Sequence, residues 1–140
     1  MRRTKHFEEP GHYIHAIVRF KSRLGGVLFV CDFDKQYHKR LVIEPVEGFL
    51  SEIDAFELLD QLEVFFNNGV EPKVFEKRED IIYWSLTNDS GCIKLYASNE
   101  ETDVLIGYLP NNLGMKDYNL ALLICSILNG DENLEERLIN

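Results

Sequence analysis

The sequence predicts an α+β protein, a single domain in which antiparallel strands form a sheet packed by two main helices. Apolar-polar alternation typical of strands occurs in two groups of three segments, separated by short polar turns. A segment with helical periodicity follows each group. The expected order is therefore βββα-βββα, with two antiparallel meanders in one sheet. We expect residues 1–140 to form this one domain.

The first meander is expected before Pro45. Residues 13–21 alternate apolar and polar positions, and residues 27–33 are apolar on both faces, as in a central strand. A third strand is expected over residues 40–44, because proline then removes a hydrogen-bond donor. Residues 1–12 are polar and are predicted to be a flexible N-terminus.

The most informative segment is the first predicted helix, residues 51–69. Ser51 is a favourable N-cap, and Gly69 tolerates the left-handed conformation that ends a helix. Apolar residues between them recur every three or four positions, which predicts one buried stripe. The stripe consists of Ala55, Leu58, Leu59, Leu62, Phe65 and Phe66.

The second meander is expected over residues 81–87, 92–98 and 103–109, and a short edge strand is expected to begin at Val74 and Phe75. The turn sequence Asn-Asp-Ser-Gly between the first two strands is a strong hairpin signal.

The chain is expected to end in a second helix and a short acidic segment. Residues 113–128 are apolar nearly all round, which predicts a helix buried on most sides. Residues 131–140 are predicted to form a short acidic C-terminal segment.

Charge is distributed unevenly along the chain. The net charge is −9, but residues 1–40 carry +5 and residues 41–140 carry −14. An acidic surface of this size repels phosphates and attracts basic surfaces, so direct nucleic-acid binding is not expected. No apolar run approaches the length of about 20 residues that a membrane span needs, so no membrane association is expected. Three widely spaced cysteines are typical of reduced thiols in a cytoplasmic protein.

The predicted function is a non-enzymatic acidic binding protein that neutralises a basic protein partner by charge complementarity. The chain has no Lys or Arg between positions 41 and 72, so the acidic side of the first helix has no cation of its own. Immunity proteins, antitoxins and phage inhibitors have this physical character, and the partner could be a nucleic-acid-acting toxin or nuclease. The expected partner-binding residues are Glu52, Asp54, Glu57, Asp60 and Glu63, with Asp131, Glu132, Glu135 and Glu136 as a second acidic patch.

No catalytic residue, metal site or cofactor is expected, since no nucleophile, phosphate-loop or metal-ligand motif stands out. His12 and His15 lie three apart on a predicted strand, where they would face opposite sides. Surface histidines are the better interpretation.

One short motif resembles an enzyme family. Apolar residues followed by Asp32-Phe33-Asp34 resemble the start of haloacid-dehalogenase-type phosphotransferases. Lys35 and Gln36 then replace the turn usual in that family, and the later chain lacks its β/α alternation and its paired acidic magnesium motif. A strand that runs into a polar turn accounts for both aspartates.

Two alternatives stay open at this point. One is a small-molecule-binding or hydrolytic domain, with a pocket between helix and sheet near Asp32, Asp34 and His38. The other is a homodimer, in which aromatic residues of the second meander, such as Trp84 and Tyr96, form a self-complementary patch.

Overall fold

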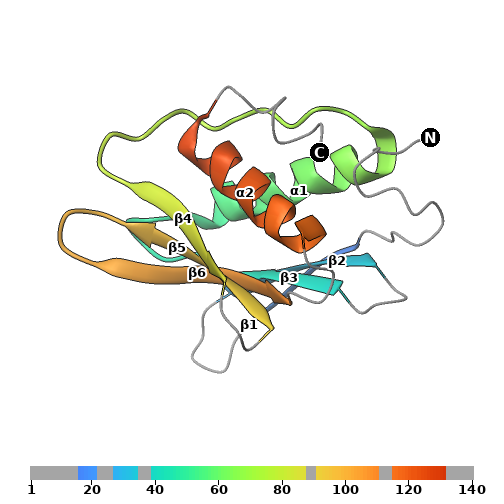
Figure 1. Ribbon diagram of the computed structural model, residues 1–140, viewed down its shortest axis with the longest axis horizontal. Coiled ribbons are helices and arrows are strands. Elements are labelled where there is room, and N and C mark those ends of the chain that lie inside the picture. The colour runs from blue at the N-terminus through green and yellow to red at the C-terminus, as the bar shows by residue number, and fades with distance from the viewer. Residues whose placement is uncertain (1–15, 22–26, 35–38, 88–90, 111–114, 132–140) are drawn as a thin grey trace.

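The computed structural model describes residues 16–21, 27–34, 39–87, 91–110 and 115–131 (Figure 1). The predicted flexible N-terminus and all but the first residue of the predicted C-terminal acidic segment lie outside these ranges. The elements are β1 (Ala16–Lys21), β2 (Val27–Asp34), β3 (Lys39–Ile43), α1 (Glu52–Asn68), β4 (Ile82–Thr87), β5 (Cys92–Ser98), β6 (Asp103–Pro110) and α2 (Met115–Asn129).

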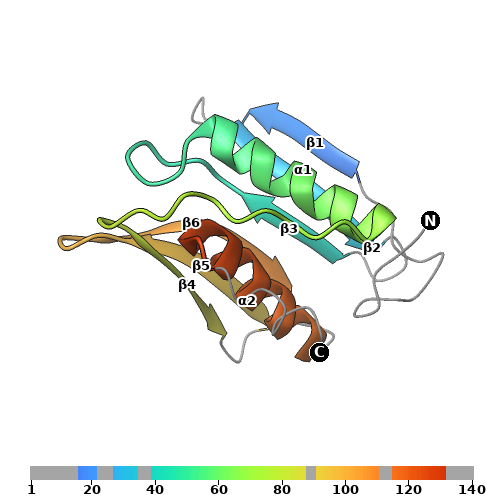
Figure 2. The same cartoon turned by 90° about the horizontal axis from the view of Figure 1, so that it is seen from above.

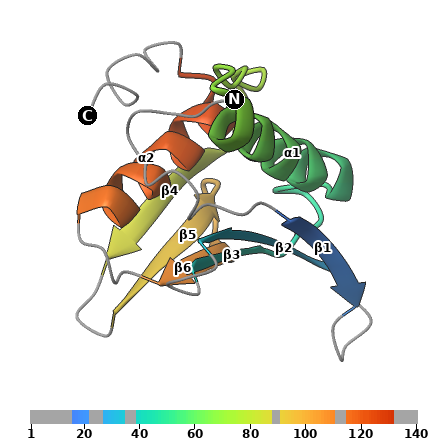
Figure 3. The same cartoon turned by 90° about the vertical axis from the view of Figure 1, so that its right-hand side faces the viewer.

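The six strands form one antiparallel sheet in the order β1-β2-β3-β6-β5-β4. Both helices pack on the same face of this sheet, α1 over β1 and β2 and α2 over β4 and β5 (Figures 2 and 3). The predicted class is therefore confirmed: a single α+β domain with an antiparallel sheet packed by two helices.

The two three-stranded units meet where β3 pairs with β6. Val42 pairs with Tyr108 and Ile43 with Gly107 at this junction, and the Glu44 N–H donates to the Ile106 carbonyl oxygen at 2.8 Å. A Cβ atom on Gly107 would lie 2.5 Å from the Val42 carbonyl oxygen. This position therefore requires glycine, because any side chain would push β3 away from β6.

Helix α1 has the predicted caps and the predicted buried stripe. The Ser51 hydroxyl accepts a hydrogen bond from the Asp54 backbone N–H at 3.0 Å. Gly69 adopts a φ of 72° and donates its N–H to the Phe65 carbonyl oxygen at 2.9 Å. All six residues of the apolar stripe are buried, so the predicted orientation of this helix is confirmed.

Helix α2 is buried on most sides, as its composition predicted. Its carboxyl-terminal half, from Leu123 to Leu128, consists entirely of buried residues. These side chains and the stripe of α1 join the inward residues of the sheet in one hydrophobic core.

The predicted short strand at Val74 and Phe75 was wrong. Residues 69–81, which join α1 to β4, contain no strand. We call residues 70–80 the connecting segment. The Phe75 N–H donates to the Ile127 carbonyl oxygen of α2 at 2.9 Å, and the Lys73 N–H donates to the Gln61 side chain of α1. Its backbone is thus bonded to the two helices, where a strand would bond to the sheet.

At the edge strand β4, a side chain of α2 forms hydrogen bonds with the backbone of one residue. The Tyr83 N–H donates to Asn129 Oδ1 at 2.8 Å, and Asn129 Nδ2 donates to the Tyr83 carbonyl oxygen at 2.8 Å. The carboxamide therefore makes both of the hydrogen bonds that a neighbouring strand would make at this position.

Replacing Asn129 with alanine is expected to lower the free energy of unfolding by about 1–3 kcal/mol, because two edge groups of β4 lose their partner. Asn129→Asp should also destabilise, since a carboxylate keeps the acceptor but cannot donate to the Tyr83 carbonyl oxygen. Asn68→Ala, at the exposed end of α1, is the control. Chemical denaturation measures all three variants, and a loss as small as that of the control would contradict the bridging role.

Candidate protein-binding surface

The acidic residues of α1 lie on the side of the helix that faces away from the sheet. Glu52, Asp54, Glu57 and Asp60 are exposed, and Glu63 is half-buried. Their spacing spreads them around the solvent side, because successive residues are rotated by about 100° along a helix. Asp54 and Glu57 face the connecting segment, where they line a groove. Asp60 and Glu63 do not line it.

The Glu63 carboxyl group has a pKa above its ordinary value. Partial burial is the main cause, because it disfavours the charged form, and the negative charge of Asp60 adds to the effect. The two residues are three positions apart, so they are neighbours on the helix surface. The charges of Asp60 and Glu63 therefore repel each other, and α1 has no Lys or Arg to offset this repulsion.

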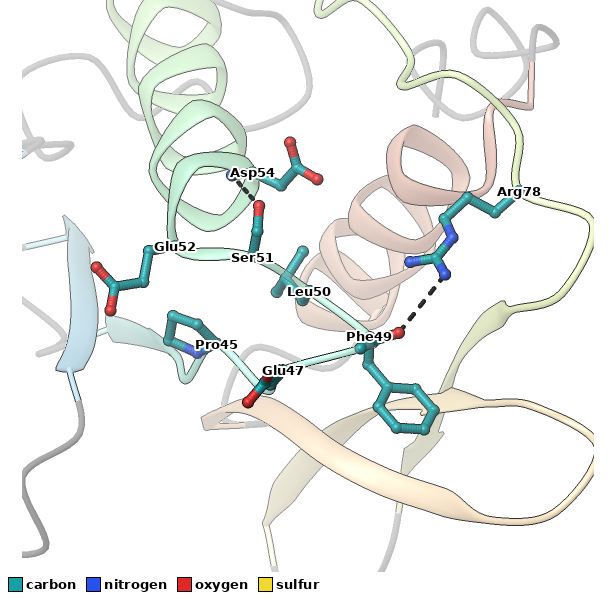
Figure 4. A pocket seen from close by; sticks show the side chains of 9 residues that line it. Pro45, Glu47, Phe49, Leu50, Ser51, Glu52, Asp54 and Arg78 are labelled. Carbon is teal, nitrogen blue, oxygen red and sulfur yellow. Dashed lines mark hydrogen bonds between the residues drawn. The ribbon is translucent and has the colours of Figure 1, made fainter.

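Two hollows open to solvent lie along α1 on the side of the connecting segment. The first, of about 440 Å³, is formed by the β3–α1 loop, the start of α1 and Arg78 (Figure 4). The second, of about 470 Å³, is the groove between α1 and the connecting segment. Asp54 and Arg78 line both, so the two hollows adjoin at these residues.

Arg78 is held in place at the point where the hollows meet. Its guanidinium donates to both carboxylate oxygens of Asp80, from Nε at 3.2 Å and from Nη2 at 2.8 Å. Nη2 also lies 3.5 Å from the Gly48 carbonyl oxygen (Figure 4). The guanidinium lowers the pKa of Asp80, mainly through its hydrogen bonding to the Asp80 carboxylate. Arg78 is thus fixed on one wall of the groove, opposite the acidic residues of α1.

The sequence alone did not predict that Lys73 and Arg78 would lie on the wall of the groove opposite α1. Lys73 and Arg78 lie outside the cation-free stretch that drew attention to α1, yet the connecting segment folds back and brings both to the groove. The groove side of the acidic helix therefore faces two cations and the carboxylate of Glu76, whereas Glu52, Asp60 and Glu63 do not line the groove. No local pattern signals this, because the hydrogen bond from Arg78 to Gly48 joins residues 30 positions apart.

The second predicted acidic patch is described only in part. Asp131 is half-buried, and its backbone N–H donates to the Ser126 carbonyl oxygen at 2.9 Å. Glu132, Glu135 and Glu136 lie outside the described residues.

The backbone of the two aspartates suggested for a small-molecule pocket belongs to strand β2. Asp32 and Asp34 lie at the end of β2, where they pair with Arg40 and Lys39 across a bulge in the ladder. The third residue suggested for that pocket, His38, lies outside the described residues.

The loop before α1 is also fixed by an aromatic residue of the sheet. The Tyr83 hydroxyl donates to the Phe49 carbonyl oxygen, so β4 is tied to the β3–α1 loop as well as to α2. Partial burial is the main reason that the pKa of Tyr83 lies above its ordinary value. The walls of the first hollow are therefore anchored to the core.

Several features bear on other functions. Within the described ranges, no group of three or more His, Cys, Asp or Glu side chains is arranged to hold a metal ion. None of the helices in these ranges is long and apolar enough to cross a membrane. Cys31 and Cys125 are buried, Cys92 is half-buried, and none of the three forms a disulfide.

Comparisons of the chain with protein-family models, with curated proteins and with solved structures found no match.

Proposed function

We propose that the protein is a non-enzymatic binding protein that recognises a basic protein partner through the solvent side of α1. The observation that carries this proposal is the set of four exposed carboxylates and one half-buried carboxylate on the solvent side of α1, a helix without any Lys or Arg. Such a surface attracts a basic partner and can raise its association rate about 10- to 1,000-fold at low salt.

Repulsion on α1 supports the proposal. Partial burial is the main reason that the pKa of Glu63 is raised, and the negative charge of Asp60 raises it further, so the charged form of Glu63 is disfavoured in the folded state. Surface charges that do not favour stability are typical of residues kept for function. A basic partner would relieve this repulsion when it binds.

The fixed groove supports the same proposal in a different way. Asp54 and Glu57 form its acidic wall, and the opposite wall carries Lys73 and the anchored Arg78. A partner that presented basic residues to α1 and an acidic residue to Arg78 would match both walls. The α1 surface would thus discriminate between partners as well as attract them.

The partner class follows from the charge. A nucleic-acid-acting toxin or nuclease needs a positive cleft for phosphates, and an acidic helix can block that cleft without any catalysis. We place the protein in the cytoplasm, with the immunity, antitoxin or phage-inhibitor type of protein as the nearest functional class. We propose neither nucleic acid nor a membrane as a direct ligand.

The alternative, a small-molecule-binding or hydrolytic domain, has less support. The space between the helices and the sheet is filled by buried apolar side chains in the described part of the chain. Both hollows lie at the surface and are open to solvent. Ligand pockets usually enclose most of a small molecule.

The triple variant Glu57→Gln, Asp60→Asn and Glu63→Gln tests the proposal. Its association with the basic partner captured from the source cells should be at least about tenfold slower at low salt, with a weaker dependence on salt. Its free energy of unfolding should stay equal or rise slightly, because repulsion on α1 is removed. Stopped-flow association and chemical denaturation measure the two effects.

A matched control changes three exposed carboxylates elsewhere, Glu44→Gln, Glu100→Gln and Glu101→Gln. Both variants change the net charge by the same amount, so only the position of the charge differs. If the α1 variant associated as fast as this control, α1 would not be the binding surface.

The pH dependence of stability gives an independent prediction about Glu63. A carboxyl group with a raised pKa in the folded state binds its proton more tightly there than in the unfolded chain. Stability should therefore fall as pH rises from the ordinary carboxyl pKa through the raised one. Glu63→Gln should remove this decrease, whereas Glu100→Gln, on an exposed loop, should retain it. Thermal midpoints between pH 3 and pH 7, a range of about four units around the ordinary carboxyl pKa, measure the effect.

A further inference from the structure

The sheet face opposite the helices carries an exposed apolar surface over β4, β5 and β6. No helix of the described chain covers this face (Figures 1 and 3). Ile82, Leu86, Leu105 and Tyr108 are 65%, 46%, 42% and 44% exposed, which is high for large apolar side chains. We call this surface the open face. It consists of Ile82, Trp84, Leu86, Lys94, Tyr96, Ser98, Asp103, Leu105 and Tyr108.

The centre of the open face is already ordered. Trp84 stacks on Tyr96 with ring centroids 4.7 Å apart and planes 17° from parallel. Trp84 Nε1 donates to Ser98 Oγ at 2.6 Å, and Ser98 Oγ donates to Asp103 Oδ1 at 2.6 Å. Binding through these rings would therefore cost little side-chain entropy.

The residues of the open face form three rows across the strands. Leu86, Lys94 and Tyr108 form one outer row, and Ile82, Ser98 and Asp103 form the other. The middle row is Trp84, Tyr96 and Leu105. The outer rows are about 13 Å apart, since they are separated by four residues of a strand.

Charge on the open face is sparse and has opposite signs at its two ends. The protein as a whole carries −9, yet this face contains one cation, Lys94, and one anion, Asp103. No partner for the Lys94 ammonium is found among the residues that the structure describes. Depletion of charge around buried aromatic residues is typical of the centre of a protein interface.

We propose that two copies of the chain pack their open faces together in a two-fold symmetric dimer, with the axis in the interface and along the Trp84–Tyr96–Leu105 row. An axis in this position and perpendicular to the strands reverses the order of the rows in the partner subunit. Lys94 then lies over Ser98 of the partner subunit, next to Asp103 of the partner subunit. Ile82 lies over Leu86 of the partner subunit.

The other face-to-face arrangement is disfavoured by charge. A two-fold axis parallel to the strands would keep the rows in the same order and place Lys94 over Lys94 of the partner subunit. Like charges in direct contact at an interface cost free energy, whereas the reversed order pairs the cation with the anion. The charges of the open face therefore select one of the two symmetric arrangements.

The size of the open face fits a weak dimer. With the four exposed fractions given above and side-chain areas of about 150–250 Å², these residues offer roughly 400 Å² per subunit, and the half-buried Trp84 and Tyr96 add to it. The resulting total is below the roughly 1,200 Å² at which stable interfaces begin, so we expect dissociation at about 100 µM. Because α1 lies on the other face of the sheet, the dimer would leave both α1 surfaces free to bind partners.

Sedimentation equilibrium of the full chain, from about 1 µM to 1 mM, tests the dimer. Leu105→Lys places like charges beside the two-fold axis and should raise the dissociation constant at least about tenfold. Ile53→Lys, a control on the exposed side of α1 where this residue is 80% exposed, should leave the constant unchanged. A monomer at every concentration, or a dimer that Leu105→Lys does not weaken, would overturn the proposal.

A charge exchange tests the orientation. Lys94→Glu alone and Asp103→Lys alone should each weaken the dimer about tenfold, because each places like charges opposite one another. The double variant should restore the wild-type constant to within about threefold, since the pair is re-formed with reversed signs. Far-ultraviolet circular dichroism checks that all variants fold. Weakening in both single variants without recovery in the double variant would refute the arrangement.

Discussion

Replacing Leu62 with alanine is expected to lower the free energy of unfolding by about 2–5 kcal/mol. Leu62 lies in the middle of the apolar stripe of α1, and its side chain is fully buried in the core. The loss combines the transfer free energy of the deleted atoms with the cost of the cavity that remains. A site surrounded by two helices and a sheet has little freedom to collapse around that cavity.

Val64→Ala is the control for this substitution. Val64 belongs to the same helix but is only half-buried, so its truncation should cost clearly less. Urea denaturation of both variants, with the slope of the transition unchanged, gives the two free energies. A loss below about 1 kcal/mol for Leu62→Ala would show that the stripe does not support the core.

The elements that the sequence predicted well are those set by local periodicity. The stripe from Ala55 to Phe66 repeats at helical spacing, and Ser51 and Gly69 mark its ends by capping chemistry that acts within a few residues. The strands of the second meander were equally clear, because inward Ile93, Leu95 and Ala97 alternate with residues of the open face. Such patterns are visible in a single sequence, since burial on one face imposes them.

The parts that escaped prediction depend on contacts between distant residues. The local sequence at Val74 and Phe75 predicts a strand, but the backbone of the connecting segment forms hydrogen bonds with Gln61 in α1 and Ile127 in α2. The bond between Asn129 and Tyr83 joins residues 46 positions apart, and nothing in either neighbourhood indicates it. Periodicity shows which face of a strand is buried, but not which edges meet.

The same distinction holds for the α1 surface. The exposed positions of Glu52, Asp54, Glu57 and Asp60 follow from the helical period. The groove that Asp54 and Glu57 share with Lys73 and Arg78 does not, because it depends on how the connecting segment returns across the helices. Charge that looked uncompensated along the chain is therefore partly balanced in space.

Gly107 is the second position at which a large effect is expected. A Cβ atom there would lie 2.5 Å from the Val42 carbonyl oxygen and 2.7 Å from Ile43 Cδ1. The first of these contacts involves backbone, so a side-chain rotation cannot relieve it, and β3 must move relative to β6. Because the pairing of these strands is short, the movement would weaken the junction between the two three-stranded units.

Gly107→Ala is therefore expected to lower the free energy of unfolding by about 1–3 kcal/mol, and Gly107→Val by more. Gly48→Ala is a contrasting case, in which backbone strain occurs without crowding. Gly48 has a φ of 90° and no atom near its missing Cβ, so its substitution costs backbone strain alone. A larger loss for Gly107→Val than for Gly107→Ala would follow if crowding between β3 and β6 is the cause. Equal stability of the wild type and both Gly107 variants in urea would mean that the junction yields without cost, and close approach would then not explain this glycine.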